Sequence, residues 1–183
     1  MRLLWARVGT PFCPDCGALI QGQSADQIIE RATAITDFLL GQGAQLIVVA
    51  CNTATIAAVE YLRANYSVPF VGMEPAVKPA VAATRTGVIG VLATGAALAG
   101  DKLHRLIDRH RGEVRVITQP CPGLVEQVER GDLDGPETRA LLTRYAEPLI
   151  AAGADTLVLG CTHYPLLTGA LSLVMGEDVT LVS

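Results

Sequence analysis

Apolar positions follow two different periods along the chain from about Ser24 onward. The segment ADQIIERATAITDFLL (25–40) keeps its apolar residues close to one helical face, and GQG after it is typical of a helix end. Continuous apolar runs predict buried strands at 46–50, 68–72, 86–94, 113–118, 156–160 and 179–183. Helical patterns between them cover 54–64, 98–110, 121–130 and 136–153, and a last helix precedes the final strand. Such alternation predicts an α/β fold with parallel sheets.

Two of the predicted strands end in the same way. GAQLIVVACNTAT (43–55) takes an apolar strand into Cys51, and GADTLVLGCTHYP (153–165) repeats this frame around Cys161. In α/β folds, ligands bind beyond the carboxyl ends of the strands. The repeat therefore predicts two related half-sites that face each other across one cleft.

The residues around these cysteines suit acid–base chemistry on a small polar substrate. A thiol at a helix N-terminus has its thiolate form favoured by the helix dipole and by free N–H groups. Short polar side chains that could hold a carboxylate or an ammonium group follow both thiols: Asn52, Thr53, Thr162 and His163. His163 is close enough in sequence to act as a base for Cys161. Two thiols on opposite faces of a carbon acid suit a stereoinversion, because one removes a proton and the other returns it.

A structural interpretation stands beside this one. Free cysteine is among the most often buried residue types, so either thiol taken alone is equally well a small core residue. The repetition of the whole frame favours function for the pair. We expect Cys121, between two prolines, to be structural, and His104 and His110 to be solvated on a charged helix.

Composition narrows the classes of partner. The 183 residues carry a net charge of -4, which shows no basic bias and argues against a nucleic-acid partner. Charged or polar residues interrupt every apolar run before it reaches membrane-spanning length, so we expect no membrane partner. The first residues lack the pattern of a secretory signal. Five cysteines at irregular spacing then fit free thiols in a reducing cytoplasm, which is the expected location.

Five motifs together resemble glutamate racemase: VVACNTAT, VGMEPAVKPA, GVIGVLAT, QPCPGLVEQVERGDLDGPE and DTLVLGCTHYPLL. They lie in the family's order over about residues 24–183. The resemblance implies an isomerase that interconverts L- and D-glutamate for peptidoglycan synthesis, without cofactor or metal, with a possible homodimer. It also implies two pseudo-symmetric α/β lobes with the active site between them. Residues 24–72 plus 171–183 would form a partial first lobe and 73–170 the second, after a foreign-looking segment, 1–23.

The resemblance also implies residue roles. It assigns catalysis to Cys51, Cys161, His163 and Glu129. It assigns substrate contacts to Asn52, Thr53, Thr94, Thr162 and His163. In the family's arrangement His163 would assist Cys161, and Glu129 would support the same side. From the residues alone, Glu129 is better interpreted as a solvated helix position.

Three family features are not found in this sequence. These are an N-terminal strand with Asp-Ser-Gly-x-Gly-Gly, a Pro-Tyr-Gly loop and a closing helix. We therefore expect one incomplete lobe and, without the Asp that assists Cys51, a rate lower by about 10²–10⁴. The alternative is a catalytically inactive racemase-like module, truncated or fused, that at most binds a dicarboxylate.

The opening segment shows a second resemblance. LLWARVGTPFCPDCG with GQSADQI, residues about 2–30, resembles part of the excinuclease ABC ATPase that recognises DNA damage. No Walker lysine motif or ABC signature accompanies it, so we expect neither ATP nor DNA binding. Cys13 and Cys16 would supply only two of four zinc ligands, and the chain offers no second pair. We expect a Pro-Asp turn that carries two thiols, and no metal.

Overall fold

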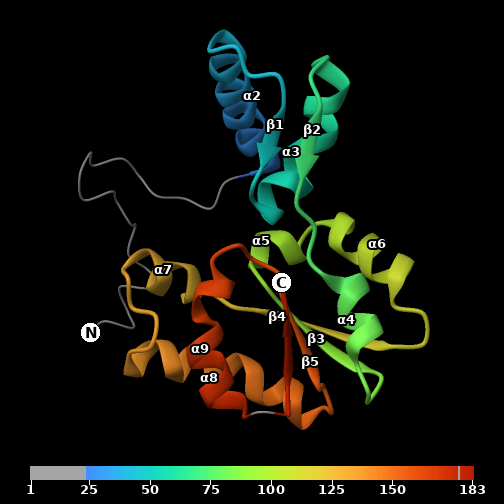
Figure 1. The fold of residues 1–183 in the computed structure, drawn as a ribbon, viewed down its shortest axis with the longest axis vertical. Helices are drawn as coiled ribbons and strands as arrows, with labels where there is room; N and C mark the ends of the chain where they lie inside the picture. Colours follow the sequence, from blue (N-terminus) through green and yellow to red (C-terminus); the bar gives the residue numbers. More distant parts are fainter. Residues whose placement is uncertain (1–23, 177) are drawn as a thin grey trace.

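The computed structural model describes residues 24–176 and 178–183, which form two parallel sheets flanked by helices (Figure 1). The smaller sheet pairs β1 (Ile47–Val49) with β2 (Phe70–Gly72). The larger sheet has the order β4-β3-β5-β6. Its strands are β3 (Val88–Ala93), β4 (Arg115–Pro120), β5 (Thr156–Leu159) and β6 (Thr180–Val182). Every pair is parallel, which confirms the predicted α/β class.

The smaller sheet forms the first lobe with α2 (Ala25–Gly41) and α3 (Asn52–Asn65). A capping box starts α2, because the Ser24 hydroxyl accepts from the Gln27 N–H while the Gln27 side chain accepts from the Ser24 N–H. One face of the sheet is buried against α3 through Ile47, Ala58, Val59, Leu62 and Phe70. On the other face Val48 and Val71 are exposed.

The larger sheet forms the second lobe, with helices on both faces. These are α4 (Val77–Ala83), α5 (Gly95–Leu98), α6 (Asp101–His110), α7 (Leu124–Glu129), α8 (Pro136–Ala151), the 3-10 turn η1 (Tyr164–Leu167) and α9 (Thr168–Met175). In β3, Ile89 and Val91 pack towards α4 and α6, whereas Leu92 packs towards α8. Burial on both faces explains why β3 and β5 are continuous apolar runs.

The chain reverses its direction of travel across the larger sheet beside β3, since β4 lies on one side of β3 and β5 on the other. A ligand site is expected at such a point, beyond the carboxyl ends of the strands. Thr94 follows β3 there, and Cys161 follows β5. The first lobe lies over this edge, where α3 contacts α5 (Figure 1).

Two helix predictions differ from the structure. The segment 98–110 is divided, because Gly100 has an extended backbone (φ -97°, ψ 140°) between α5 and α6. The helix α4 was not predicted, because its proline disturbs the helical pattern. A proline is tolerated in the first turn of a helix, where its missing N–H has no intrahelical partner to lose.

The C-terminal segment 171–183 differs in its placement. The sequence groups it with the first lobe, whereas in the structure α9 packs on α8 and β6 pairs with β5, with Leu181 opposite Leu157. A strand, a crossover helix and a second strand place parallel neighbours side by side in one sheet, and this local connection decides the location of β6.

The opening segment 1–23, which includes the Cys13–Cys16 pair, lies outside the described residues. Among the helices that the structure describes, none is long and apolar enough to span a membrane.

Candidate active site

Cys51 lies at the junction between β1 and α3. Its backbone is extended (φ -150°, ψ 126°), and its carbonyl accepts the first helical hydrogen bond, from the Thr55 N–H at 2.8 Å. The thiol is half-buried and makes no capping hydrogen bond to the helix. The first N–H groups of this 14-residue helix therefore remain available to an anion.

Cys161 is buried, with 8% of its surface exposed. The residues after it form the 3-10 turn η1, so the helix-start environment predicted for both thiols is found at Cys51 alone. Burial raises the pKa of the Cys161 thiol; the backbone N–H groups of His163 and Thr162 lower it in part, and the neighbouring Cys51 raises it further. Cys51 is therefore close enough to Cys161 to interact with it electrostatically.

A chain of three side chains begins at Cys161. Its sulfur lies 3.6 Å from His163 Nδ1, and His163 Nε2 lies 2.5 Å from Glu129 Oε1. When Nε2 donates to the carboxylate, Nδ1 is left as an acceptor that faces the thiol. Glu129 ends α7 and is exposed, yet it contacts His163 rather than only solvent. The geometry thus favours the resemblance over the solvated-helix interpretation of Glu129.

Three further predicted residues, Asn52, Thr53 and Thr94, join the lobes. Asn52 Nδ2 donates to the Gly160 carbonyl at 3.0 Å, a buried contact between positions 108 residues apart. The Thr53 and Thr94 hydroxyl oxygens lie 3.1 Å apart. Thr94 also caps α5 by accepting from the Ala97 N–H. These side chains hold the ends of β1, β3 and β5 together.

A cavity of about 340 Å³ opens at this junction. It is lined by three of the predicted residues, Asn52, Cys161 and Thr162. Met73, Glu74 and Ser183 complete part of its wall. Its size is in the range of small-molecule sites.

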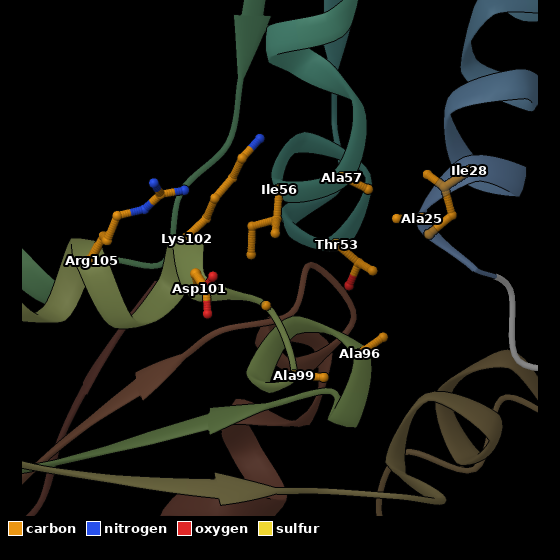
Figure 2. Close-up of a pocket in the computed structure, with 11 residues that line it drawn as sticks. Ala25, Ile28, Thr53, Ile56, Ala57, Ala96, Ala99, Asp101, Lys102 and Arg105 are labelled. Atoms are coloured by element: carbon orange, nitrogen blue, oxygen red, sulfur yellow. The ribbon is translucent and has the colours of Figure 1, made fainter.

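A second cavity, of about 450 Å³, lies between the lobes on the side of α2 and α6. Figure 2 shows its mostly aliphatic lining, with Ile56 of α3 beside Lys102 of α6 and Thr53 above Ala96 of α5. Thr53 lines this second cavity, whereas Cys161 borders the smaller one.

Sequence reasoning missed three residues of the site. Gly160 supplies the carbonyl for Asn52, and a Cβ there would lie 2.6 Å from the Leu92 carbonyl oxygen. Tyr164 is buried beside Cys161 and Cys121. The sequence did show a small residue directly before Cys161, and this pattern could have identified Gly160. Glu74 lies in the cavity wall, and apart from its place in the motif VGMEPAVKPA the sequence gave no indication of it.

Two cysteines thus follow strands of a two-lobed parallel α/β fold, Cys51 after β1 and Cys161 after β5. The family model described as Asp/Glu/Hydantoin racemase matches residues 10–182, and the chain belongs to this family. Its curated relatives include the glutamate racemases of Ectopseudomonas mendocina, 55% identical over 93% of this chain and 66% of the relative, and of Herpetosiphon aurantiacus, 53% identical over 88% and 63%. The chain thus spans slightly less than two thirds of the length of these relatives.

Solved structures agree with these relatives. The Escherichia coli glutamate racemase, in complex with L-glutamate and the activator UDP-MurNAc-ala, superposes with a TM-score of 0.79 at 35% identity, over 87% of this chain and 61% of that one. A glutamate racemase isoform of Bacillus anthracis gives 0.78 at 31%, over 88% and 61%. The resemblance to glutamate racemase and the two-lobed fold are confirmed. The resemblance of residues 2–30 to excinuclease is not confirmed, because the racemase family model already matches from residue 10.

Proposed function

We propose that this chain carries the acid–base site of a glutamate racemase, which interconverts L- and D-glutamate by proton transfer at Cα. The observation that carries the proposal is the contact of the Cys161 sulfur with His163, and of His163 with Glu129, beside a second thiol, Cys51. The high identity to curated glutamate racemases supports glutamate as the substrate.

The reaction needs one thiol on each face of the substrate carbon. A thiolate takes the Cα proton, the resulting carbanion is held by hydrogen-bond donors, and the other thiol delivers a proton to the opposite face. His163 Nδ1 accepts the Cys161 proton when that thiol must become the base. An amino acid Cα–H is a very weak acid, so the cleft must exclude water and offer donors, which the burial of Cys161 and the start of α3 supply.

The setting of the reaction follows from the same proposal. D-Glutamate would serve peptidoglycan synthesis, and the free thiols Cys51, Cys121 and Cys161 suit a reducing cytoplasm. A homodimer remains a proposal from the resemblance, and sedimentation measures it directly.

Proton exchange in D₂O tests the chemistry. L-Glutamate and D-glutamate are incubated separately with the chain, and α-proton loss and optical inversion are followed. We expect exchange to favour the enantiomer whose proton faces Cys161, because within the described part of the chain no side chain hydrogen-bonds the Cys51 thiol. Cys161→Ala should lower exchange by at least about 10².

Cys16→Ala serves as the control and should leave the exchange rate unchanged. Equal exchange of both enantiomers would contradict the unequal roles of the thiols. No exchange by a chain with a native circular dichroism spectrum would overturn the proposed activity.

A further inference from the structure

The hydroxyl group of Tyr164 is buried without a hydrogen-bond partner among the described residues. The residue is 1% exposed, and its ring lies in the second-lobe core that also holds Cys121, Tyr145 and Cys161. A buried hydroxyl group that forms no hydrogen bond is unfavourable for folding, so its presence in a native core requires an explanation.

The polar side chains around this hydroxyl group are already engaged. The Tyr145 hydroxyl donates to the Pro122 carbonyl at 2.7 Å, and the Cys121 thiol donates to the Gln119 carbonyl at 3.3 Å. Cys121 therefore offers the phenol only its sulfur, which is a weak acceptor. Burial raises the pKa of Cys121 to about 12, and the Tyr164 hydroxyl is among the groups that lower it in part. The phenol thus lies beside a neutral thiol that cannot fully satisfy it.

Cys161 is the neighbour of Tyr164 whose charge changes in the proposed reaction. The two residues are three positions apart, and the Tyr164 N–H donates to the Cys161 carbonyl at 3.0 Å. When His163 takes the proton of the Cys161 thiol, a negative charge remains on a residue that is 8% exposed. Burial disfavours this charge, whereas hydrogen-bond donors favour it. The unpaired O–H group in the same core is such a donor.

We propose that Tyr164 keeps its O–H group in reserve for the Cys161 thiolate and orients it toward this sulfur when the thiol loses its proton. Tyr164 is a positioning residue, because it acts through the thiol and not on the substrate. A dipole that is already in place in a buried site is effective, since little water competes with it. The inference rests on the proposed function and adds to it a residue that the sequence did not indicate.

The other ionisable groups around this core cannot take the same role. They come from every element packed against Cys161 or Tyr164: Cys51 at the start of α3, Cys121 after β4, Glu126 and Glu129 on α7, Tyr145 on α8, and His163 before η1. Ionised carboxylates donate no hydrogen bond, and they oppose a negative charge at Cys161. Burial raises the pKa of the Tyr164 hydroxyl far above its ordinary value, so this group keeps its proton and remains a donor.

Alkylation of Cys161 by iodoacetamide across a range of pH tests this inference on the full chain. Cys161 is the one cysteine after Arg144, so mass spectrometry of the tryptic peptide 145–183 reports this thiol by itself. Tyr164→Phe keeps the ring and should raise the pH midpoint of alkylation by about 1–2 pH units, the range of one hydrogen bond to a charged group. At a fixed pH below both midpoints, α-proton exchange of glutamate should slow by about 10–100-fold while KM stays unchanged.

Stability separates this role from a purely structural one. Tyr164→Phe removes an unpaired buried group, so the urea midpoint of unfolding should stay unchanged or rise. Tyr145→Phe is the matched control, because it removes a hydroxyl group of the same core that is donated to the Pro122 carbonyl. This control should lower the urea midpoint and leave the alkylation of Cys161 unchanged.

An unchanged alkylation midpoint in Tyr164→Phe would overturn the inference while the proposed function stands. An equal upward shift in both variants would also overturn it, because it would show a general loosening of the core. A lower urea midpoint in Tyr164→Phe would show that the hydroxyl group has a partner in the folded chain, with the same consequence. A wild-type chain that exchanges no glutamate would overturn the proposed function, and the alkylation midpoints would still decide whether Tyr164 stabilises the thiolate.

Discussion

The two predicted catalytic thiols have different neighbours. Cys161 is buried and contacts His163, whereas Cys51 is half-buried at the start of a helix. Both were identifiable from the repeated strand–cysteine frame, because that frame is local in sequence. The contact of His163 with Glu129 joins positions 34 residues apart, and no local pattern reports it. Glu129 could be assigned only through the resemblance.

Glu129 is a positioning residue in this arrangement, and its removal should have a modest effect. The His163 and Glu129 side chains are 31% and 67% exposed, and exposed ion pairs contribute about 0.2–1 kcal/mol. Glu129→Gln keeps an acceptor for Nε2, so kcat for racemisation should fall by less than about tenfold while KM stays unchanged.

Steady-state kinetics of racemisation measure the changes in kcat and KM. Glu126→Gln, an exposed position on the same helix, is the control and should behave as the wild type. A change confined to KM would show that Glu129 acts on substrate binding instead.

At the scale of elements, one carboxylate holds the amino ends of β3 and β5 together. Asp155 precedes β5 and accepts hydrogen bonds from the Thr84 hydroxyl at 2.6 Å and from the backbone N–H groups of Arg85 and Thr86 at 2.7 and 3.0 Å. Burial acts to raise the pKa of Asp155, but these bonds outweigh it and lower the pKa to about 2. These three hydrogen bonds, here called the Asp155 clasp, lie at the edge of the sheet opposite the cysteines.

Asp155→Asn should lower the free energy of unfolding by about 1–3 kcal/mol at pH 7, because an amide cannot accept all of these bonds. The depressed pKa sets the pH dependence. The stabilisation is complete above about pH 4, the ordinary range of a free carboxyl, and is lost as the pH falls through about 2. The difference between variant and wild type should therefore shrink below about pH 4.

Urea unfolding followed by circular dichroism at several pH values measures the difference. Asp108→Asn, which removes an exposed carboxylate 3.1 Å from Arg111, is the control and should change stability by about 0.5 kcal/mol or less. A wild-type to Asp155→Asn gap that stays constant down to pH 2 would contradict the clasp.

Whether a segment forms a helix or a strand was largely predictable from the sequence. Which strands pair with each other was not. Buried strands such as β3 and β5 are continuous apolar runs, and this pattern needs no tertiary information. The break between α5 and α6 depends on the backbone angles of Gly100. Glycine adopts many backbone conformations, so the sequence does not indicate which one occurs there. The pairing of β6 with β5 depends on how α9 packs on α8, which a three-residue strand cannot indicate.

At the scale of the whole molecule, the two lobes differ in how completely they are covered. In the described part of the chain the first-lobe sheet has two strands, and Val48 and Val71 are 56% and 47% exposed. Ile89 and Val158, at the centre of the second lobe, are fully buried. A two-stranded sheet has little stability of its own, so the first lobe depends on α2, α3 and the contacts to its neighbour.

Amide hydrogen exchange should show this difference. The amides of β1 and β2 should exchange faster than those of β3 and β5, because local opening is easiest where few apolar contacts must break. Exchange followed by NMR or mass spectrometry measures both lobes in one sample, so β5 is the internal reference. Equal protection of the two sheets would contradict the prediction.

The relative placement of the lobes was beyond the sequence. It depends on Asn52 meeting Gly160, 108 positions away, and on Thr53 meeting Thr94, 41 positions away. The sequence predicted that both cysteines face one cleft from the symmetry of their frames. The sequence did not indicate that the residues expected to contact substrate also connect the lobes. A polar side chain that follows a strand suits substrate binding and a contact between lobes equally well.

The partner of Asn52 across the lobes is a main-chain oxygen, which every amino acid carries. A substitution at position 160 therefore keeps this carbonyl oxygen. A larger residue there would place its Cβ too close to the carbonyl oxygen of Leu92. Of the two residues in this hydrogen bond, only position 52 can therefore lose or change its hydrogen-bonding group through a single substitution.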